Sequence, residues 1–356
     1  MSWKNILIIF AVIIGIHAVV IMAIVNSNKP EPQKKNVATD NVAEKNSRSV
    51  PDKTEEKQDK KTAVKTAEKV KPSQPGMVKP FIFGKTQALP PALQKQAKRA
   101  RSGILIDLNS RKVLWSKRAR HPVAVASLTK LMTALLIAEK MEKDPGFKWT
   151  KPVKITAEAT NVERSCVLGV KKDELYILGE LMQSMMINSH NDSAAQLAAE
   201  HSGNVGNFVK LMNFSAHSRG MLSTRFNSPN GLPQGKKRIN SFASAEDICH
   251  ICEELMKYPK IMQLCVMRSA RLHTGRRVYS HNNLLLGPTK RRPKRRPVDG
   301  LIGFKTGFTN AAGSCLAFGV KRNGRTVIGC VTGFPSAADR DNFCRGVIEW
   351  TFRKNK

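Results

Sequence analysis

The chain has 356 residues, enough for one large domain or two small ones, and carries 60 lysines and arginines against 27 acidic residues. A net charge of +33 suggests nucleic-acid binding, but the basic residues are spread along the chain and no known nucleic-acid module is visible. We therefore expect no nucleic-acid partner. The seven cysteines are odd in number and irregularly spaced, which argues against a complete disulfide framework.

The chain begins with an apolar segment at residues 6–25, interrupted only by Gly15 and His17. Twenty such residues can span the hydrocarbon core of a bilayer and exceed the apolar region of a usual signal peptide. No Ala-x-Ala cleavage site follows. The alternative is a signal peptide cleaved at Val25-Asn26-Ser27. We expect an uncleaved single-pass anchor at 6–25 behind a cytoplasmic stub at 1–5.

Residues 26–80 are rich in Lys, Glu, Pro, Gln, Ser and Thr and contain almost no aromatic residues. Such a segment cannot bury enough apolar surface to offset the entropy lost on ordering. We expect a disordered Lys-rich linker here, followed by a folded catalytic domain at 81–356.

Within that domain, strand patterns lie near both ends and helical patterns lie between them, from about residue 126 to 257. The turn Arg322-Asn323-Gly324 favours a hairpin because Asn-Gly tolerates positive φ. These patterns predict an α+β fold, with one antiparallel sheet from N- and C-terminal hairpins, flanking helices and an inserted helical lobe. The expected strands are 102–107 with 112–117 and 314–321 with 325–332, and the expected closing helix is 339–352.

A serine and a lysine three residues apart open the helical region. Apolar residues follow Ser127 at the i, i+3, i+4, i+7 spacing of a packed helix: Leu128, Leu131, Met132, Leu135 and Leu136. Because positions i and i+3 share a helix face, the Lys130 amine can reach the Ser127 hydroxyl. The pair therefore predicts a nucleophile with a built-in base; an ordinary N-cap at Ser127 is the alternative.

Two further motifs follow in order. Ser189-His190-Asn191 lies between the expected helical runs 174–187 and 192–201, where polar side chains can face a cleft. Lys305-Thr306-Gly307 precedes an expected strand from 308 to 319. This triplet, with Asp in place of His190, is typical of class A β-lactamases and penicillin-binding proteins.

From about Ser102 to Phe352 the chain resembles serine-type D-Ala-D-Ala carboxypeptidases, the low-molecular-mass penicillin-binding proteins of the β-lactamase-like superfamily. The family often has Gly where this chain has His190, and the basic segment 290–297 looks like an inserted loop. Many members carry a C-terminal β-rich domain, which we expect to be absent here. The further segments that carry the resemblance are 126–134, 228–232, 282–285, 305–309 and 312–313.

The resemblance implies a role for each motif residue. Ser127 would be the nucleophile, Lys130 its base, made neutral by burial and by Lys305, and Ser189 the proton relay to the leaving amine. Asn191 would bind the substrate amide, and the backbone N–H groups of Ser127 and Phe308 would form the oxyanion hole. The substrate's terminal carboxylate would be bound by Lys305, Thr306, Gly307 and Arg340. The alternative to carboxylate binding by Arg340 is that it is an ordinary surface residue at the start of a helix.

The implied reaction is removal of the terminal D-Ala from peptidoglycan stem pentapeptides through a Ser127 acyl-enzyme, with β-lactam antibiotics as covalent inhibitors. It requires no metal or cofactor. The resemblance places the catalytic domain outside the cytoplasm, held at the cell membrane by the N-terminal helix. The alternatives are a D,D-endopeptidase, a serine β-lactamase and an inactive wall-binding protein. No glutamate could be assigned to the fast deacylation that a β-lactamase needs.

Two cysteine pairs allow more than one interpretation. Cys249 and Cys252 form a Cys-x-x-Cys pair in a helical run, but without a second ligand pair we favour buried helix cysteines over a zinc or redox site. Cys315 and Cys330 lie on consecutive expected strands and could form a disulfide, a question that the sequence leaves open.

Overall fold

The computed structural model describes residues 76–163, 165–287 and 296–353. They all belong to one compact unit, Val70–Lys356; the other unit is Met1–Lys69. The expected anchor at 6–25, nearly all of the expected linker and most of the basic segment 290–297 lie outside the described residues. Within the described part of the chain, no helix is both long and apolar enough to cross a bilayer.

The unit is built around a five-stranded antiparallel sheet, which confirms the predicted α+β fold. The N-terminal hairpin joins the C-terminal strands because Ser102 on its inner strand pairs with Thr332. The turn between the last two strands has positive φ at Asn323 and Gly324, as the Asn-Gly signal predicted. In sheet order, the strands are β2 (Val113–Lys117), β1 (Ser102–Asp107), β11 (Arg325–Phe334), β10 (Gly313–Arg322) and β9 (Leu301–Thr309).

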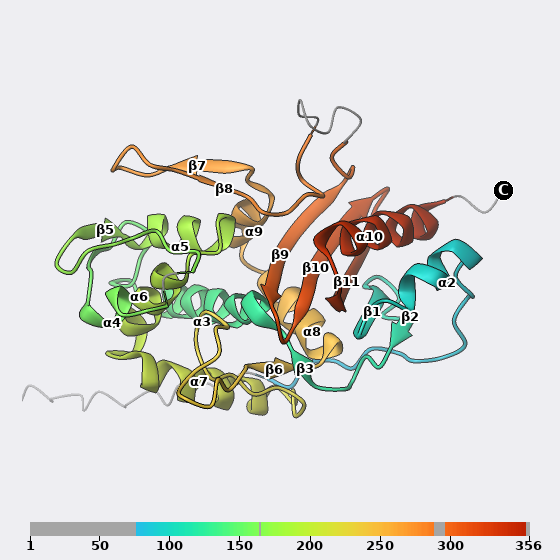
Figure 1. The fold of residues 1–356 in the computed structure, drawn as a ribbon, viewed down its shortest axis with the longest axis horizontal. Coiled ribbons are helices and arrows are strands. Elements are labelled where there is room, and N and C mark those ends of the chain that lie inside the picture. Colours follow the sequence, from blue (N-terminus) through green and yellow to red (C-terminus); the bar gives the residue numbers. More distant parts are fainter. Residues whose placement is uncertain (1–75, 164, 288–295, 354–356) are drawn as a thin grey trace, which may run out of the picture. The chain divides into compact units, whose positions relative to one another are not determined.

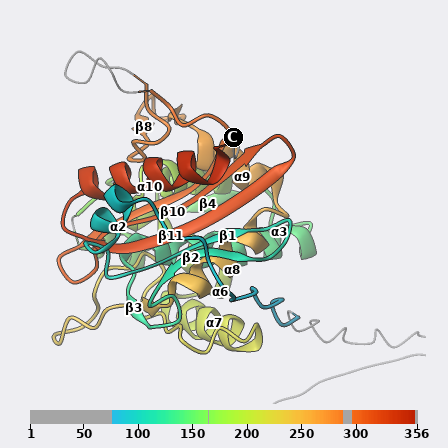
Figure 2. The ribbon, with the colours of Figure 1, turned by 90° about the vertical axis from the view of Figure 1, so that its right-hand side faces the viewer.

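Helices cover both faces of the sheet (Figures 1 and 2). The closing helix α10 (Ala337–Phe352) and the short α2 (Pro91–Ala97) lie on one face, and α8 (Ala245–Leu255) lies on the other. Because successive strand residues point to opposite faces, Leu105 packs in the cluster that contains the α10 side chains, whereas Ile104 packs in the cluster of α8.

The helical lobe is inserted in the sequence between β2 and β9, as predicted. The helix α3 (Lys130–Lys143) runs through it and is buried on all sides over its first half, from Lys130 to Ala138, where Thr133 and Lys130 itself are the polar residues. The other helices are α4 (Ala157–Thr160), α5 (Leu178–Ile187), α6 (Asn191–Ser202), α7 (Val205–Ser218) and α9 (Pro259–Val266). Three two-stranded pairs complete the unit: β3 (Val123–Ala124) with β6 (Phe242–Ala243), β4 (Pro152–Lys154) with β5 (Leu175–Ile177), and β7 (Ser269–Arg271) with β8 (Arg277–Tyr279).

Two expected boundaries were wrong. The run expected to be helical from residue 174 begins as strand β5, because that segment pairs with β4 before the helix starts at Leu178. The single strand expected from 308 to 319 is divided between two strands, because β9 runs from Leu301 to Thr309 and β10 begins at Gly313; Lys305 therefore lies in the middle of β9. The partner strand decides both boundaries, since Ala317 on β10 pairs with Lys305.

Gly231 fits tightly against the turn that precedes α3. Its φ is +84°, and a Cβ built there would lie 2.0 Å from the backbone oxygen of Ala126 and 3.0 Å from Thr129 Oγ1. A side chain at this position would therefore push directly on the backbone next to Ser127. Gly235 offers a comparison, because its φ is +68° but a Cβ there would meet nothing within 4 Å.

We expect Gly231→Ala to lower the free energy of unfolding by clearly more than Gly235→Ala, which carries only the left-handed strain of about 1 kcal/mol. Urea denaturation of both variants measures the difference. Equal losses would show that the Gly231 contact does not constrain the turn.

Candidate active site

The predicted pair of Ser127 and Lys130 is present, with the two residues one helical turn apart. Ser127 lies in the short 3₁₀ helix η1 (Ala126–Thr129), and Lys130 is the first residue of α3. The Lys130 Nζ donates to Ser127 Oγ at 3.0 Å. Ser127 caps neither helix, since the N-cap positions are Val125 and Thr129, so the N-cap interpretation was wrong.

Lys130 is fully buried and bonded on all sides. Besides Ser127, its Nζ donates to Asn191 Oδ1 and to the backbone oxygen of Asn230, each at 2.7 Å. Burial lowers the pKa of Lys130 well below its usual value, and the nearby Lys305 charge lowers that pKa further. The site therefore favours the neutral amine, which is the form able to accept a proton.

The second motif forms the turn between α5 and α6. Ser189 is buried with φ at +68°, an unusual left-handed conformation for a residue with a side chain. No hydrogen bond among the described residues joins it to Lys130, so its relay role stays a prediction. Asn191 starts α6; its Oδ1 accepts from Lys130, and its Nδ2 donates to the Ser165 oxygen at 2.5 Å. Asn191 thus holds the lysine, a contact not expected from sequence, while binding of a substrate amide stays a prediction.

The third motif approaches Ser127 from β9. Lys305 is buried and donates to the Thr306 oxygen at 3.1 Å. The pKa of Lys305 is lowered to about 8, mainly by burial and also by the Arg340 charge, against opposing effects of Cys166 and Cys265. A Cβ built on Gly307 would lie 3.2 Å from the Ser127 nitrogen, so glycine lets this strand approach Ser127 closely.

A cleft of about 540 Å³ joins the three motifs. The predicted residues that line it are Ser127, Ser189, Asn191, Thr306, Gly307, Phe308 and Arg340. Phe308 is 63 % exposed, so its ring is free to contact a ligand in the cleft. The tertiary structure thus assembles residues from η1, the α5–α6 turn, β9 and α10 at one place.

Arg340 reaches the cleft from the first turn of α10 and is 4 % exposed, so the surface-arginine interpretation was wrong. Its Nε and one terminal nitrogen donate to Asp341 Oδ1 at 2.9 and 2.7 Å, and the other donates to the Cys315 oxygen at 3.1 Å. The guanidinium is therefore held in place; its binding of a substrate carboxylate stays a prediction.

Sequence reasoning gave no role to three residues of the site. The Asn230 oxygen bonds Lys130, and only the resemblance of segment 228–232 pointed to that loop. The buried Asp192 carboxylate accepts from the backbone nitrogens of residues 168, 169 and 170, at 2.9, 2.7 and 3.3 Å, and so fixes a loop beside the cleft. Cys166 is exposed in the cleft wall, and no pattern in the sequence marked it.

All seven cysteines are free. A disulfide between Cys315 and Cys330 does not form, because Cys330 pairs across the sheet with Ala317 and Cys315 pairs with Gly307. Cys249 and Cys252 are buried in α8, where burial raises the pKa of both thiols. They are buried helix cysteines, as the sequence favoured.

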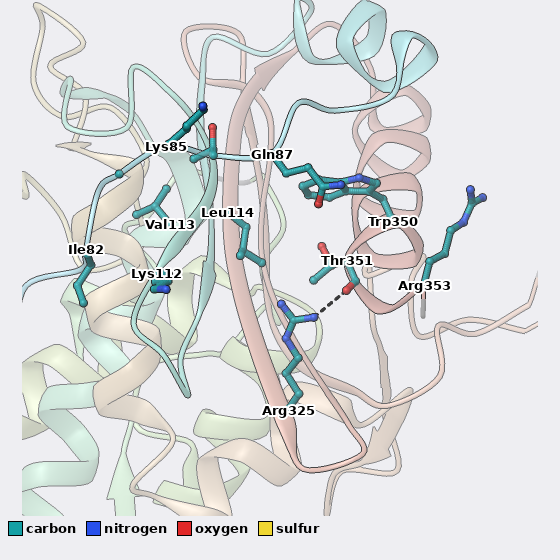
Figure 3. A pocket seen from close by; sticks show the side chains of 12 residues that line it. Ile82, Lys85, Gln87, Lys112, Val113, Leu114, Arg325, Trp350, Thr351 and Arg353 are labelled. Carbon is teal, nitrogen blue, oxygen red and sulfur yellow. Dashed lines mark hydrogen bonds between the residues drawn. The ribbon is translucent and has the colours of Figure 1, made fainter. Parts of the chain in front are cut away.

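A second cavity of about 490 Å³ lies at the opposite edge of the sheet, beside β2 (Figure 3). Arg325 is fixed there by donation to the Thr351 oxygen at 2.8 Å and to Asp107 at 2.7 Å. Lys85, Lys112 and Trp350 also line it. None of its twelve lining residues is a serine or a cysteine, so we take the cleft at Ser127 as the candidate active site.

Comparison with known proteins identifies a family of peptidases that this chain resembles. Residues 88–336 match the family described as D-alanyl-D-alanine carboxypeptidase. The chain is 30 % identical over 256 residues to D-alanyl-D-alanine carboxypeptidase DacF of Bacillus subtilis, covering 72 % of this chain and 63 % of that protein. It is 28 % identical over 253 residues to a D-alanyl-D-alanine endopeptidase of Escherichia coli, covering 70 % and 75 % of the two chains.

The fold is likewise shared with solved structures. A D-alanyl-D-alanine carboxypeptidase from Mycobacterium tuberculosis superposes with a TM-score of 0.61 at 26 % identity, covering 78 % of this chain and 97 % of that one. The chain spans a little less than two thirds of the DacF length, 63 %. On the family match over residues 88–336, the chain belongs to the D-alanyl-D-alanine carboxypeptidase family.

Proposed function

We propose that this protein is a serine D,D-carboxypeptidase that removes the terminal D-Ala from peptidoglycan stem pentapeptides through an acyl-enzyme on Ser127. The observation that carries the proposal is the 3.0 Å contact between Ser127 Oγ and a buried Lys130 whose pKa is strongly lowered. A neutral amine beside a serine hydroxyl in a cleft is the arrangement that activates this weak nucleophile.

The contacts of Lys130 also orient its lone pair. A neutral amine has two hydrogens and one lone pair. When both hydrogens are donated to Asn191 Oδ1 and the Asn230 oxygen, the lone pair is left for Ser127, so in the neutral form the hydrogen bond between them reverses and the Ser127 hydroxyl becomes the donor. Lys130 then takes the hydroxyl proton as Oγ bonds to the carbonyl carbon of the penultimate D-Ala.

The next steps use the other cleft residues. The C–N bond breaks, and Ser189 passes a proton from the Lys130 ammonium to the departing D-Ala amine. Water then attacks the ester carbonyl carbon while Lys130 accepts the water proton, and Lys130 returns that proton to Ser127 Oγ as the ester C–O bond breaks. The Ser127 and Phe308 N–H groups stabilise the oxyanion in both halves, each by roughly 3–4 kcal/mol. The tight approach of Gly307 to the Ser127 nitrogen supports this pairing of donors from η1 and β9.

Cationic and polar groups on β9 and α10 bind the terminal carboxylate of the peptide in this proposal. Lys305 and Arg340 supply positive charge, and Thr306 and Gly307 line the same wall of the cleft. We further propose that the apolar segment 6–25 anchors the chain in the cell membrane with the catalytic unit outside the cytoplasm, where peptidoglycan lies.

A second candidate is a D,D-endopeptidase that cleaves peptidoglycan crosslinks. It is favoured by similarity to proteins described as D-alanyl-D-alanine endopeptidases in Escherichia coli and Pseudomonas aeruginosa, at 28 % and 29 % identity. Both activities would use the same acyl-enzyme and differ in the leaving group, which is a single D-Ala in one case and a crosslinked stem in the other.

Incubation with muropeptides, followed by mass spectrometry, separates these two candidates. We expect pentapeptide stems to lose one alanine while crosslinked dimers stay intact. Separation of dimers into monomers would establish the endopeptidase instead. If pentapeptide stems and crosslinked dimers both stay unchanged, the proposed function is wrong.

Ser127→Ala should abolish labelling by a fluorescent penicillin and lower D-Ala release at least roughly 10³-fold, since the variant lacks the hydroxyl that contacts Lys130. Ser116→Ala, on the exposed edge strand β2, is the matched control and should label normally. Equal labelling of the Ser127 variant and the wild type would place the nucleophile elsewhere.

The two lysines predict a bell-shaped dependence of kcat/KM on pH. Activity rises with pH as Lys130 loses its proton and becomes a base. It falls again as pH passes about 8, because Lys305 loses the charge that binds the carboxylate. Arginine stays protonated over this range, so Lys305→Arg should retain activity to higher pH than the wild type. An unchanged alkaline limb would remove Lys305 from carboxylate binding.

A further inference from the structure

His190 occupies the middle of the Ser-x-Asn motif and is 4 % exposed. It is the N-cap residue of α6 and lies directly between Ser189 and Asn191. Both ring nitrogens are engaged. Nδ1 lies 2.7 Å from Ser184 Oγ on α5, and Nε2 lies 2.8 Å from Asn188 Nδ2.

The surrounding bonds select one tautomer of this ring. Asn188 Oδ1 accepts the Tyr279 backbone N–H at 2.8 Å, which fixes the amide so that Nδ2 is turned to His190. An amide nitrogen can only donate, so His190 Nε2 must be the unprotonated acceptor. Nδ1 therefore carries the hydrogen and donates to Ser184 Oγ, which also accepts from Ser193 Oγ at 2.9 Å.

The ring is also held neutral. The pKa of His190 is lowered to about 4, mainly by burial and also by Arg276, His281 and Lys130, against an opposing effect of Asp192. These groups come from α6, the β7–β8 hairpin, the segment after β8, and α3. Protonation would force Nε2–H against Asn188 Nδ2, so charge and hydrogen bonding favour the same neutral form.

This ring connects three elements behind the catalytic turn. Ser184 belongs to the last turns of α5, and His190 starts α6. Through Asn188 the network reaches Tyr279 on β8, and the β7–β8 hairpin packs beside α5 (Figure 1). Ser189, held between Asn188 and His190, keeps a φ of +68°, and a left-handed residue of this kind persists only where its surroundings hold it.

We propose that His190 is a positioning residue of this D,D-peptidase: its neutral ring, bonded between Ser184 and Asn188, fixes the left-handed turn that presents Ser189 and Asn191 to Lys130. The proposal rests on the proposed function for its activity readout. Because a displacement of about 1 Å of a catalytic group can cost about 100-fold in rate, loss of this network should be visible in acylation.

Asn188→Asp tests the network with an isosteric change in the full chain. The carboxylate still accepts from Tyr279 but can no longer donate to His190 Nε2. Ring ¹⁵N NMR of histidine-labelled protein should show the Nδ1–H tautomer in the wild type at pH 7 and a ring carrying a hydrogen on Nε2 in the variant. The rate constant for acylation by penicillin should fall roughly 10- to 100-fold.

Two further variants make the test specific. His190→Leu should lower acylation by a similar factor, and His190→Gln, which supplies an acceptor and a donor, should recover part of it. Asn207→Asp, on the exposed side of α7, is the matched control and should acylate at the wild-type rate. Thermal unfolding of each variant identifies any that fails to fold.

The outcomes are separable. A folded Asn188→Asp protein that acylates at the wild-type rate, or that loses activity without a change in the His190 tautomer, would overturn the role of His190. Failure of the wild type to form an acyl-enzyme would overturn the proposed function itself, and the role of His190 in it.

Discussion

The site depends on a fully buried amine whose hydrogen-bond partners, among the described residues, are neutral oxygens rather than a carboxylate. Transfer of an unpartnered Lys130 ammonium from water to this buried position would cost free energy. Hydrogen bonds to neutral acceptors, rather than an ion pair, stabilise the amino group there. Three oxygens surround Nζ: a hydroxyl, an amide oxygen and a backbone carbonyl. A carboxylate partner would stabilise the charged form, whereas these neutral acceptors combined with burial favour the free amine.

The fold brings those oxygens together by close backbone approaches at positions that exclude side chains. Gly307 on β9 and Gly231 in the loop before β6 both press on the η1 turn. A Cβ at either position would meet backbone atoms within 3.2 Å. The glycines therefore set how closely β9 and the loop before β6 pack against the η1 turn, because a side chain at either position would separate them.

Backbone strain is present at the turns around the site. Ala126, next to Ser127, and Cys166 and Ser189, which line the cleft or border it, all have positive φ. Asn191 ties these segments together, since its backbone nitrogen donates to the Cys166 oxygen at 2.9 Å and its side chain bonds Ser165 and Lys130. Hydrogen bonds to the side chain and backbone of one residue therefore hold two strained turns in register.

The sequence alone determined what depends on neighbours along the chain. The contact of Ser127 with Lys130 follows from one helical turn, and the hairpin at Asn323-Gly324 follows from the positive φ that those residues allow. The order of strands and helices likewise predicted the sheet and its inserted lobe.

Only the tertiary structure decided which distant groups surround the amine. Asn191 and Asn230 lie 61 and 100 residues from Lys130, and no local rule indicates that their oxygens converge on it. The same holds for the depth of Lys305 in β9 and for the partner that holds Arg340. Such contacts depend on strand register and on how elements pack across the sheet, which short-range propensities do not specify.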